Sequence, residues 1–116
     1  MTRLTSGVAA DAAHLPVAFE PVPLDQVVSG TPMTRSVDLD EASGRTVGVW
    51  EHTPGVSRDV EVDEVFVVLA GSARIEFEHP VLPPIEVRAG SIVRLEEGMH
   101  TVWTVRETLR KVYVAP

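Results

Sequence analysis

Hydrophobic and polar residues alternate along much of the C-terminal half of the chain. Ala73, Ile75 and Phe77 alternate with charged residues, and residues 85–88 repeat the pattern. Because successive side chains of a β-strand point to opposite faces, a period of two indicates strands with one buried and one solvated face. The pattern therefore predicts β-structure over this part of the chain.

Further strands are predicted by β-branched and aromatic composition and by the turns between them. Residues 64–69 form an almost continuous apolar run that we expect to end at Gly71, and prolines 80, 83 and 84 predict a loop. Residues 24–28 fit either one helical turn or a short strand. The other predicted strands are residues 46–52, 91–95, 102–105 and 109–114. Turns recur roughly every 8 to 12 residues, which predicts an all-β sandwich or barrel.

Length and local composition predict one domain. A chain of 116 residues can bury one core but is too short for two. Residues 1–16 show no periodicity and end at Pro16, so we expect a flexible N-terminal tail there and a single domain over residues 17–116.

Charge and composition exclude several classes of function. The net charge of -7 argues against binding to nucleic acid or to anionic membranes, which favour a basic surface. The absence of cysteine excludes disulfides and thiolate metal sites. No apolar run approaches the roughly 20 residues that span a bilayer, and the N-terminal residues lack the continuous apolar stretch of a signal peptide. We therefore expect a cytoplasmic protein.

Two short motifs indicate a family. Glu64 precedes Gly71 by seven residues within an apolar strand, and a second motif runs from Gly90 through Gly98 to His100. Over residues 48–113 the chain resembles the cupin superfamily, which carries two motifs of this kind. The resemblance implies an all-β fold, the RmlC-like double-stranded β-helix or jelly-roll barrel.

A narrower resemblance involves the cupin domain of ureidoglycine aminohydrolase and the ethanolamine-utilisation cupins. The residues that carry it are Gly48, Trp50, Glu51, Pro54, Gly55, Asp63, Glu64, Trp103, Lys111 and Tyr113. The aminohydrolase activity does not follow from it, because the metal-bearing enzymes of that type contain two cupin domains. The resemblance also implies a homodimer.

The resemblance implies three histidines and one glutamate as ligands of a metal, and this chain departs from that set. The three histidine positions fall on Arg58, Val60 and Thr101, so only Glu64 remains. We therefore expect no metal and no cofactor bound in the usual cupin way. An atypical site built from His52, Glu64 and His100 stays open, although we interpret the two histidines as surface or rim residues.

Strand alternation selects candidate site residues. It predicts that Arg58, Val60 and Glu64 point into the barrel with Phe66 and Val68, joined by Thr101 and Trp103. A carboxyl group in an apolar cavity is suited to acid/base chemistry, so Glu64 is the candidate catalytic residue or ligand anchor. The candidate substrate-binding residues are Arg58, for an anionic group, and Trp50, Phe66, Thr101, Trp103 and Tyr113.

Two neighbouring groups of polar residues are expected outside the barrel. Lys111 and Tyr113 share one face of the last strand, and they face solvent or a partner chain if Val112 and Val114 fill the core. The acidic residues of the segment 59–64 are interpreted as a solvated strand face.

The sequence thus predicts a small-molecule-binding cupin. The prediction includes a further step, in which the protein is a metal-independent acid/base enzyme that acts on a small polar metabolite. Two alternatives remain: a non-enzymatic ligand-sensing or assembly module, and a metal-dependent cupin enzyme with atypical ligands. The sequence identifies neither the ligand nor the choice between enzyme and binder.

Overall fold

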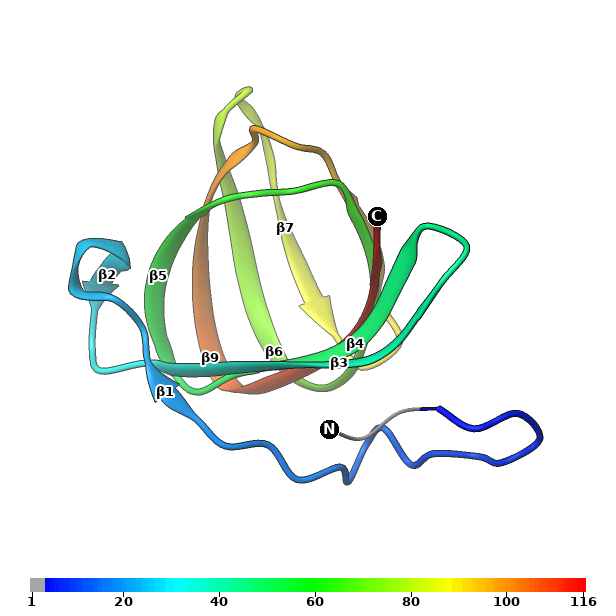
Figure 1. Cartoon of the computed structure of the whole chain (residues 1–116). Coiled ribbons are helices and arrows are strands. Elements are labelled where there is room, and N and C mark those ends of the chain that lie inside the picture. The colour runs from blue at the N-terminus through cyan, green and yellow to red at the C-terminus, as the bar shows by residue number, and fades with distance from the viewer. Residues whose placement is uncertain (1–3) are drawn as a thin grey trace.

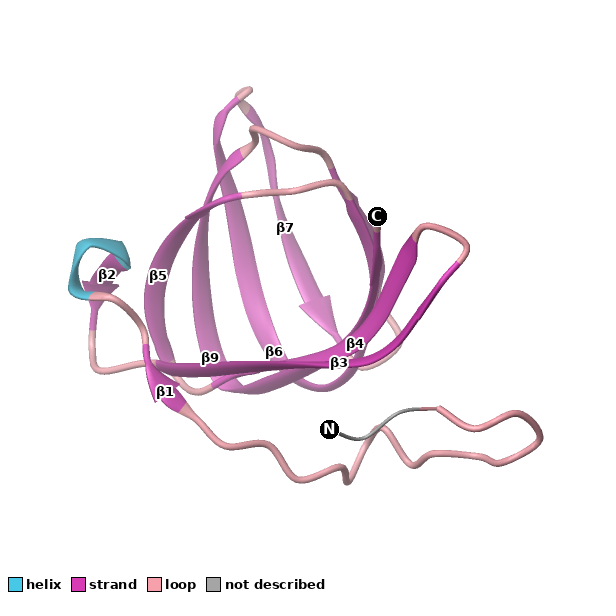
Figure 2. Cartoon of the chain, in the orientation of Figure 1, coloured by secondary structure: helices cyan, strands magenta, loops and turns pink. Residues whose placement is uncertain are grey.

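A computed structural model of the protein describes residues 4–116, and over these residues the fold is built from antiparallel strands (Figures 1 and 2). The elements are β1 (Glu20–Pro21), the 3-10 turn η1 (Leu24–Gln26), β2 (Val27–Ser29), β3 (Met33–Ala42), β4 (Arg45–His52), β5 (Gly55–Val60), β6 (Glu64–His79), β7 (Leu82–Arg88), β8 (Ile92–Leu95) and β9 (His100–Ala115). Figure 1 shows the sheet curled into a barrel, which confirms the expected all-β jelly-roll fold.

Strand β9 lies at the centre of the sheet. Its first half pairs with β5 and its second half with β4, while β6 runs along its other edge over almost the whole length. Strand β6 pairs on its far edge first with β8 and then with β7. Both long strands therefore change partner near their middle, which bends the sheet around one interior.

Three expectations about strand ends were wrong. Strand β6 continues through Gly71 to His79, and the segments 102–105 and 109–114 belong to the single strand β9. Strand β7 includes Pro83 and Pro84. Among the described residues β7 pairs only with β6, which leaves one of its edges without sheet hydrogen bonds from them, and proline is tolerated on such an edge.

Gly71 bends β6 instead of ending it. Its φ of +87° is readily adopted only by glycine, and the β6–β9 register shifts between Ala70 and Ser72. A Cβ atom at this position would overlap the backbone carbonyl of Thr108 on β9. The bend therefore depends on both the backbone freedom and the missing side chain of Gly71.

The inner face of the barrel forms the main hydrophobic core. Its buried residues are Phe66, Val68, Ala73, Ile75, Val87, Leu95, Trp103, Val105, Leu109 and Tyr113. The N-terminal segment lies against the outside, where Leu4 N donates to Leu39 O and the Arg110 guanidinium donates to Ala12 O. Within residues 4–116 there is no helix with the length and apolar character needed to cross a bilayer.

We expect the Gly71→Ala substitution to lower the free energy of unfolding by about 2–5 kcal/mol, because it adds backbone strain and a clash with Thr108. Gly90→Ala is the matched control, since Gly90 has a φ of +95° but open space where a Cβ would lie. The control should lose only about 1–2 kcal/mol from the backbone. Urea unfolding followed by circular dichroism measures both, and equal losses would contradict the proposed clash.

Candidate functional site

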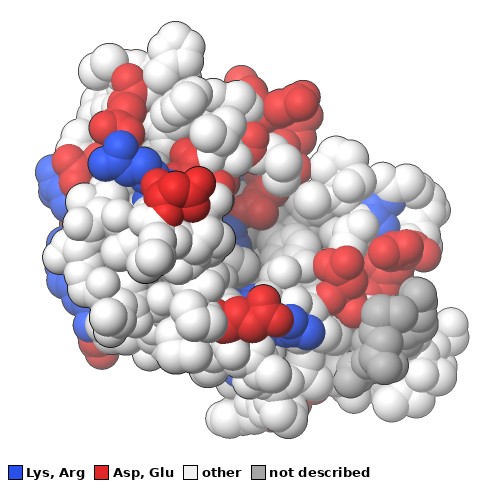
Figure 3. Space-filling model, turned by 60° about the vertical axis from the view of Figure 1, so that its left-hand side comes forward, with Lys and Arg blue, Asp and Glu red and all other residues white. Residues whose placement is uncertain are grey.

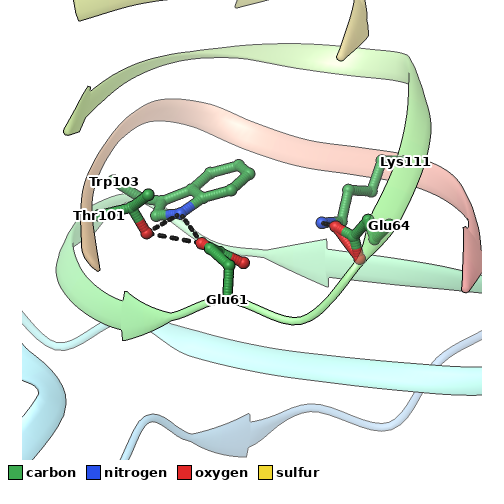
Figure 4. A network of polar contacts seen from close by, with 5 residues as sticks. All are labelled: Glu61, Glu64, Thr101, Trp103 and Lys111. Carbon is green, nitrogen blue, oxygen red and sulfur yellow. Dashed lines mark hydrogen bonds and ion pairs between the residues drawn. The ribbon is translucent and has the colours of Figure 1, made fainter. Parts of the chain in front are cut away.

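Polar side chains from two strands and one turn meet inside the barrel (Figure 4). Glu61 lies in the turn between β5 and β6, Glu64 begins β6, and Thr101, Trp103 and Lys111 lie on β9. We call these five residues the interior cluster. Its members come together because β9 turns the same face inward before and after its change of partner.

Glu61 accepts two hydrogen bonds at one oxygen. Its Oε2 accepts from the Thr101 hydroxyl at 2.5 Å and from Trp103 Nε1 at 3.0 Å. The residue is only 7% exposed. Its backbone is bonded to the loop just before β9, because Glu61 N donates to Met99 O and Gly98 N donates to Glu61 O. Glu61 is thus a buried carboxyl group in a fixed orientation.

Glu64 forms an ion pair with Lys111. The Lys111 Nζ donates to Glu64 Oε1 at 2.5 Å, and the side chains are 6% and 11% exposed for Lys111 and Glu64 respectively. The same ammonium lies over three aromatic rings, 4.2 Å from the centroid of Phe66, 4.6 Å from that of Trp50 and 5.0 Å from that of Trp103. The pair and the rings together stabilise a charge that burial alone would make costly.

The electrostatics of the site favour protonation of two carboxyl groups. Burial raises the pKa of Glu61, although the hydrogen bonds from Thr101 and Trp103 and the charge of Lys111 act in the opposite direction. Partial burial also raises the pKa of Asp59, which still reaches solvent, and the charge of Glu64 adds to that rise. The site therefore combines carboxyl groups that differ in their tendency to hold a proton.

The prediction that Arg58 and Val60 point into the barrel was wrong. Arg58 pairs with Val102 and Val60 with His100, whereas Asp59 pairs with the buried Thr101. Arg58 and Val60 are exposed and lie on the outer face. Residues 61–63 form a turn outside any strand, so the alternation of β6 cannot be extended back into β5.

Two residues that sequence reasoning placed in solvent lie inside the barrel. Lys111 is buried, and so is Glu61, although it belongs to the segment expected to be a solvated face. The half-buried Val112 and Val114 face outward, so Lys111 and Tyr113 take the inner positions. The available signal was the strand face, because alternation places Lys111 on the same face as Leu109 and Tyr113.

The other candidates selected from the sequence lie on the inner face. Phe66 and Trp103 are buried in the core, and Trp50 packs against it with its ring centroid 5.4 Å from that of Trp103. The buried Tyr113 ring lies beneath Gly48, and its hydroxyl donates to Asp38 Oδ1 at 2.6 Å. Because that hydroxyl is already bonded to β3, Tyr113 contributes mainly its ring to the interior.

The two candidate histidines do not join Glu64. His52 is buried, which corrects its interpretation as a rim residue, and its Nδ1 donates to Thr53 O while Nε2 accepts from the Ser57 hydroxyl at 2.8 Å. Burial lowers the pKa of His52. His100 is exposed and lies beside His79. Across the described residues, no three side chains of the His, Cys, Asp and Glu types are grouped to hold a metal ion.

Removal of the Lys111 charge tests the contribution of the ion pair between Glu64 and Lys111 to stability. We expect Lys111→Met to lower the free energy of unfolding by about 3–5 kcal/mol, because Glu64 would be left as a buried, unpaired carboxylate. The double variant Lys111→Met with Glu64→Gln should recover much of that loss. Denaturant unfolding of the two single variants and the double variant measures the coupling energy, and additive losses would contradict the pairing.

The raised pKa values of Asp59 and Glu61 predict how stability depends on pH. A carboxyl group with a raised pKa binds protons more tightly in the folded state, so stability falls as pH rises from its ordinary pKa to its folded value. Glu61→Gln removes the Glu61 part of that loss, so its melting temperature should fall less than that of the wild type as pH rises above the ordinary pKa of a glutamate. The same pH dependence of the melting temperature in the variant and the wild type would contradict a raised pKa of Glu61.

Comparisons with known proteins agree with this architecture. A family model described as the EutQ-like cupin domain matches residues 39–113. A protein of unknown function from Pseudomonas syringae pv. tomato has a similar fold, with a TM-score of 0.73 and 24% identity over 88% of this chain and 45% of its own. This chain therefore spans less than half of that protein.

Two further solved structures have similar folds. A putative ethanolamine utilization protein Q from Salmonella typhimurium gives a TM-score of 0.61 at 16% identity, over 86% of this chain and 94% of its own. A protein of unknown function from Acidithiobacillus ferrooxidans gives 0.58 at 25% identity, over 91% of this chain and 98% of its own. No curated protein matches the chain.

Proposed function

The chain belongs to the EutQ-like cupin domain family, and on that premise we propose that it binds a small polar molecule at the interior cluster. One observation carries the proposal: an ion pair, Glu64 with Lys111, lies inside the barrel and yet keeps contact with solvent. Polar groups that converge within aromatic walls are typical of small-molecule sites.

The site has side chains suited to acid/base chemistry that uses no metal ion. Glu64 carries a negative charge balanced by Lys111, whereas burial favours the neutral, proton-carrying form of Glu61. Two carboxyl groups in different environments can act as proton donor and proton acceptor on one bound molecule. We therefore propose Glu61 as the acid and Glu64 as the base or anchor of a metal-independent reaction.

The ligand is sought by thermal shift against a panel of small polar metabolites. The narrower resemblance to the ureidoglycine aminohydrolase cupin adds ureido compounds to that panel. We expect at least one compound to raise the melting temperature of the wild type and to have a much smaller effect on Glu64→Gln. The matched control is Glu97→Gln, which changes the same charge at an exposed loop position.

Equal shifts for wild type and Glu64→Gln, or no shift with any compound, would refute the proposed site. Incubation of the best ligand with wild-type protein, followed by mass spectrometry, then separates an enzyme from a non-enzymatic sensing module. Metal content of untagged protein, measured by plasma mass spectrometry, tests the metal-independent part. A near-stoichiometric transition metal would overturn that part.

A further inference from the structure

The outer face of the sheet carries a regular pattern of side chains across five strands. The pairing of β3, β4, β9, β6 and β8 sets their residues side by side in two adjacent rows, which we call the outer rows. The first row is Asp40, Val47, Val114, Val65 and Arg94, and the second row is Val37, Val49, Val112, Val67 and Ile92. Apart from the two charged ends of the first row, every member is aliphatic.

The chain leaves much of this aliphatic surface uncovered. Ile92 is 71% exposed and Val67 is 36% exposed. The half-buried aliphatic members are Val37, Val47, Val65, Val112 and Val114. The N-terminal segment is bonded to the outer side of the barrel at Leu39 and Arg110, and both residues lie outside the outer rows. A connected aliphatic surface of this kind is typical of a site of interaction with another macromolecule.

Two hollows adjoin Val114 in the first row. One hollow, of about 300 Å³, is lined in part by Asp40 and Val47. The other, of about 530 Å³, is lined in part by Val65 and Arg94. None of the N-terminal residues that the structure describes lines either hollow. Both ends of the first row are therefore accessible to a partner.

Opposite charges stand at the two ends of the pattern. Asp40 lies on β3 and Arg94 on β8, and neither forms an ion pair within residues 4–116. Just beyond the first row the signs are exchanged, because Arg45 begins β4 and Glu96 follows β8. Over the same described residues these two side chains also form no ion pair. Each side of the surface thus carries the charges that the other side lacks.

A second copy of the chain is the complement of this pattern. Strand β9 is the middle strand of the five, so a twofold axis along β9 lays β8 of each copy over β3 of the other. Arg94 then faces the partner's Asp40, and the valines of the two copies meet between these charges. The strands of the two sheets run in nearly the same direction, which is a common arrangement of packed sheets.

The net charge of the chain restricts how two copies can approach. The chain has a net charge of -7, and acidic side chains are prominent on the face drawn in Figure 3. Two copies therefore repel each other in most relative orientations. The arrangement around β9 brings opposite charges together, so electrostatic complementarity favours this orientation over the others.

We propose that the outer rows form the interface of a symmetric homodimer in which Arg94 of each copy pairs with the partner's Asp40. The aliphatic members supply the buried centre of this interface, and Arg45 of each copy lies toward the partner's Glu96. The proposal is independent of what the interior cluster binds, because the outer rows lie on the opposite face of the sheet.

Sedimentation equilibrium of the full chain over a concentration series tests the proposal. We expect the wild type to sediment with twice the mass of one chain. Ile92→Glu should raise the dimer dissociation constant about tenfold or more, because it places a charge within the aliphatic centre. The matched control is Val81→Glu, which makes the same kind of change at the exposed turn between β6 and β7 and should leave the dissociation constant unchanged.

Exchange of charges tests the twofold arrangement itself. Arg94→Glu alone and Asp40→Arg alone should each raise the dissociation constant about tenfold or more, because each sets like charges opposite one another twice per dimer. An equimolar mixture of the two variants should dimerise nearly as tightly as the wild type, since every Arg94–Asp40 contact then joins opposite charges. Circular dichroism of each variant verifies that it is folded, and recovery in the mixture shows the same.

Three results would overturn the proposal. A wild type with the mass of a single chain up to about 100 µM would exclude the dimer. A dimer that is unaffected by both Ile92→Glu and Arg94→Glu would use another surface. Charge variants that weaken the dimer singly and do not recover when mixed would refute the pairing of Arg94 with the partner's Asp40.

Discussion

The pairing of β6 with β9 is the constraint on which the rest of the structure depends. Each strand has 16 residues, and they pair along nearly their whole length while their other partners change. The register sets Val68 opposite Lys111 and Ile75 opposite Trp103. One pair of strands thus lines both the apolar core and the interior cluster, and Gly71 permits the bend between them.

The charged interior is stable only because its members satisfy one another. A buried ammonium costs several kcal/mol in desolvation unless a counter-charge and suitable dipoles replace water. Glu64 supplies the counter-charge for Lys111, and three aromatic faces supply the rest. Apolar residues of similar volume would fill this space at lower electrostatic cost, so stability does not explain a polar cluster here, and the binding role proposed for it is in keeping with that.

The cluster also changes how the missing metal ligands are understood. Two of the positions at which the cupin resemblance expects histidine, Arg58 and Val60, lie on the outer face, and Thr101 donates to Glu61. The glutamate that remains is bonded to a lysine of the same chain. The positive charge beside Glu64 therefore comes from a side chain, and the acid/base chemistry proposed for the site rests on the carboxyl groups around it.

Much of the fold was predictable because it depends on local pattern. Alternation and turn residues predicted the strands of an all-β fold, and the resemblance to the cupins implied the jelly-roll barrel, which the structure confirms. Strand ends were less predictable: Gly71 and Pro83 look like terminators in sequence, yet one is a bend and the other lies on an edge strand. Whether such a residue ends a strand depends on what the neighbouring strand places beside it.

The sequence by itself determined the all-β fold and the inward position of Glu64, Phe66, Thr101 and Trp103, because alternation within one strand is a local property. Only the tertiary structure decided that Arg58 points outward and that Glu61 and Lys111 point inward. The first depends on a turn that breaks the alternation between β5 and β6. The second depends on a charge partner 47 residues away for Lys111 and on hydrogen-bond donors 40 and 42 residues away for Glu61, and such distant partners meet only when the barrel closes.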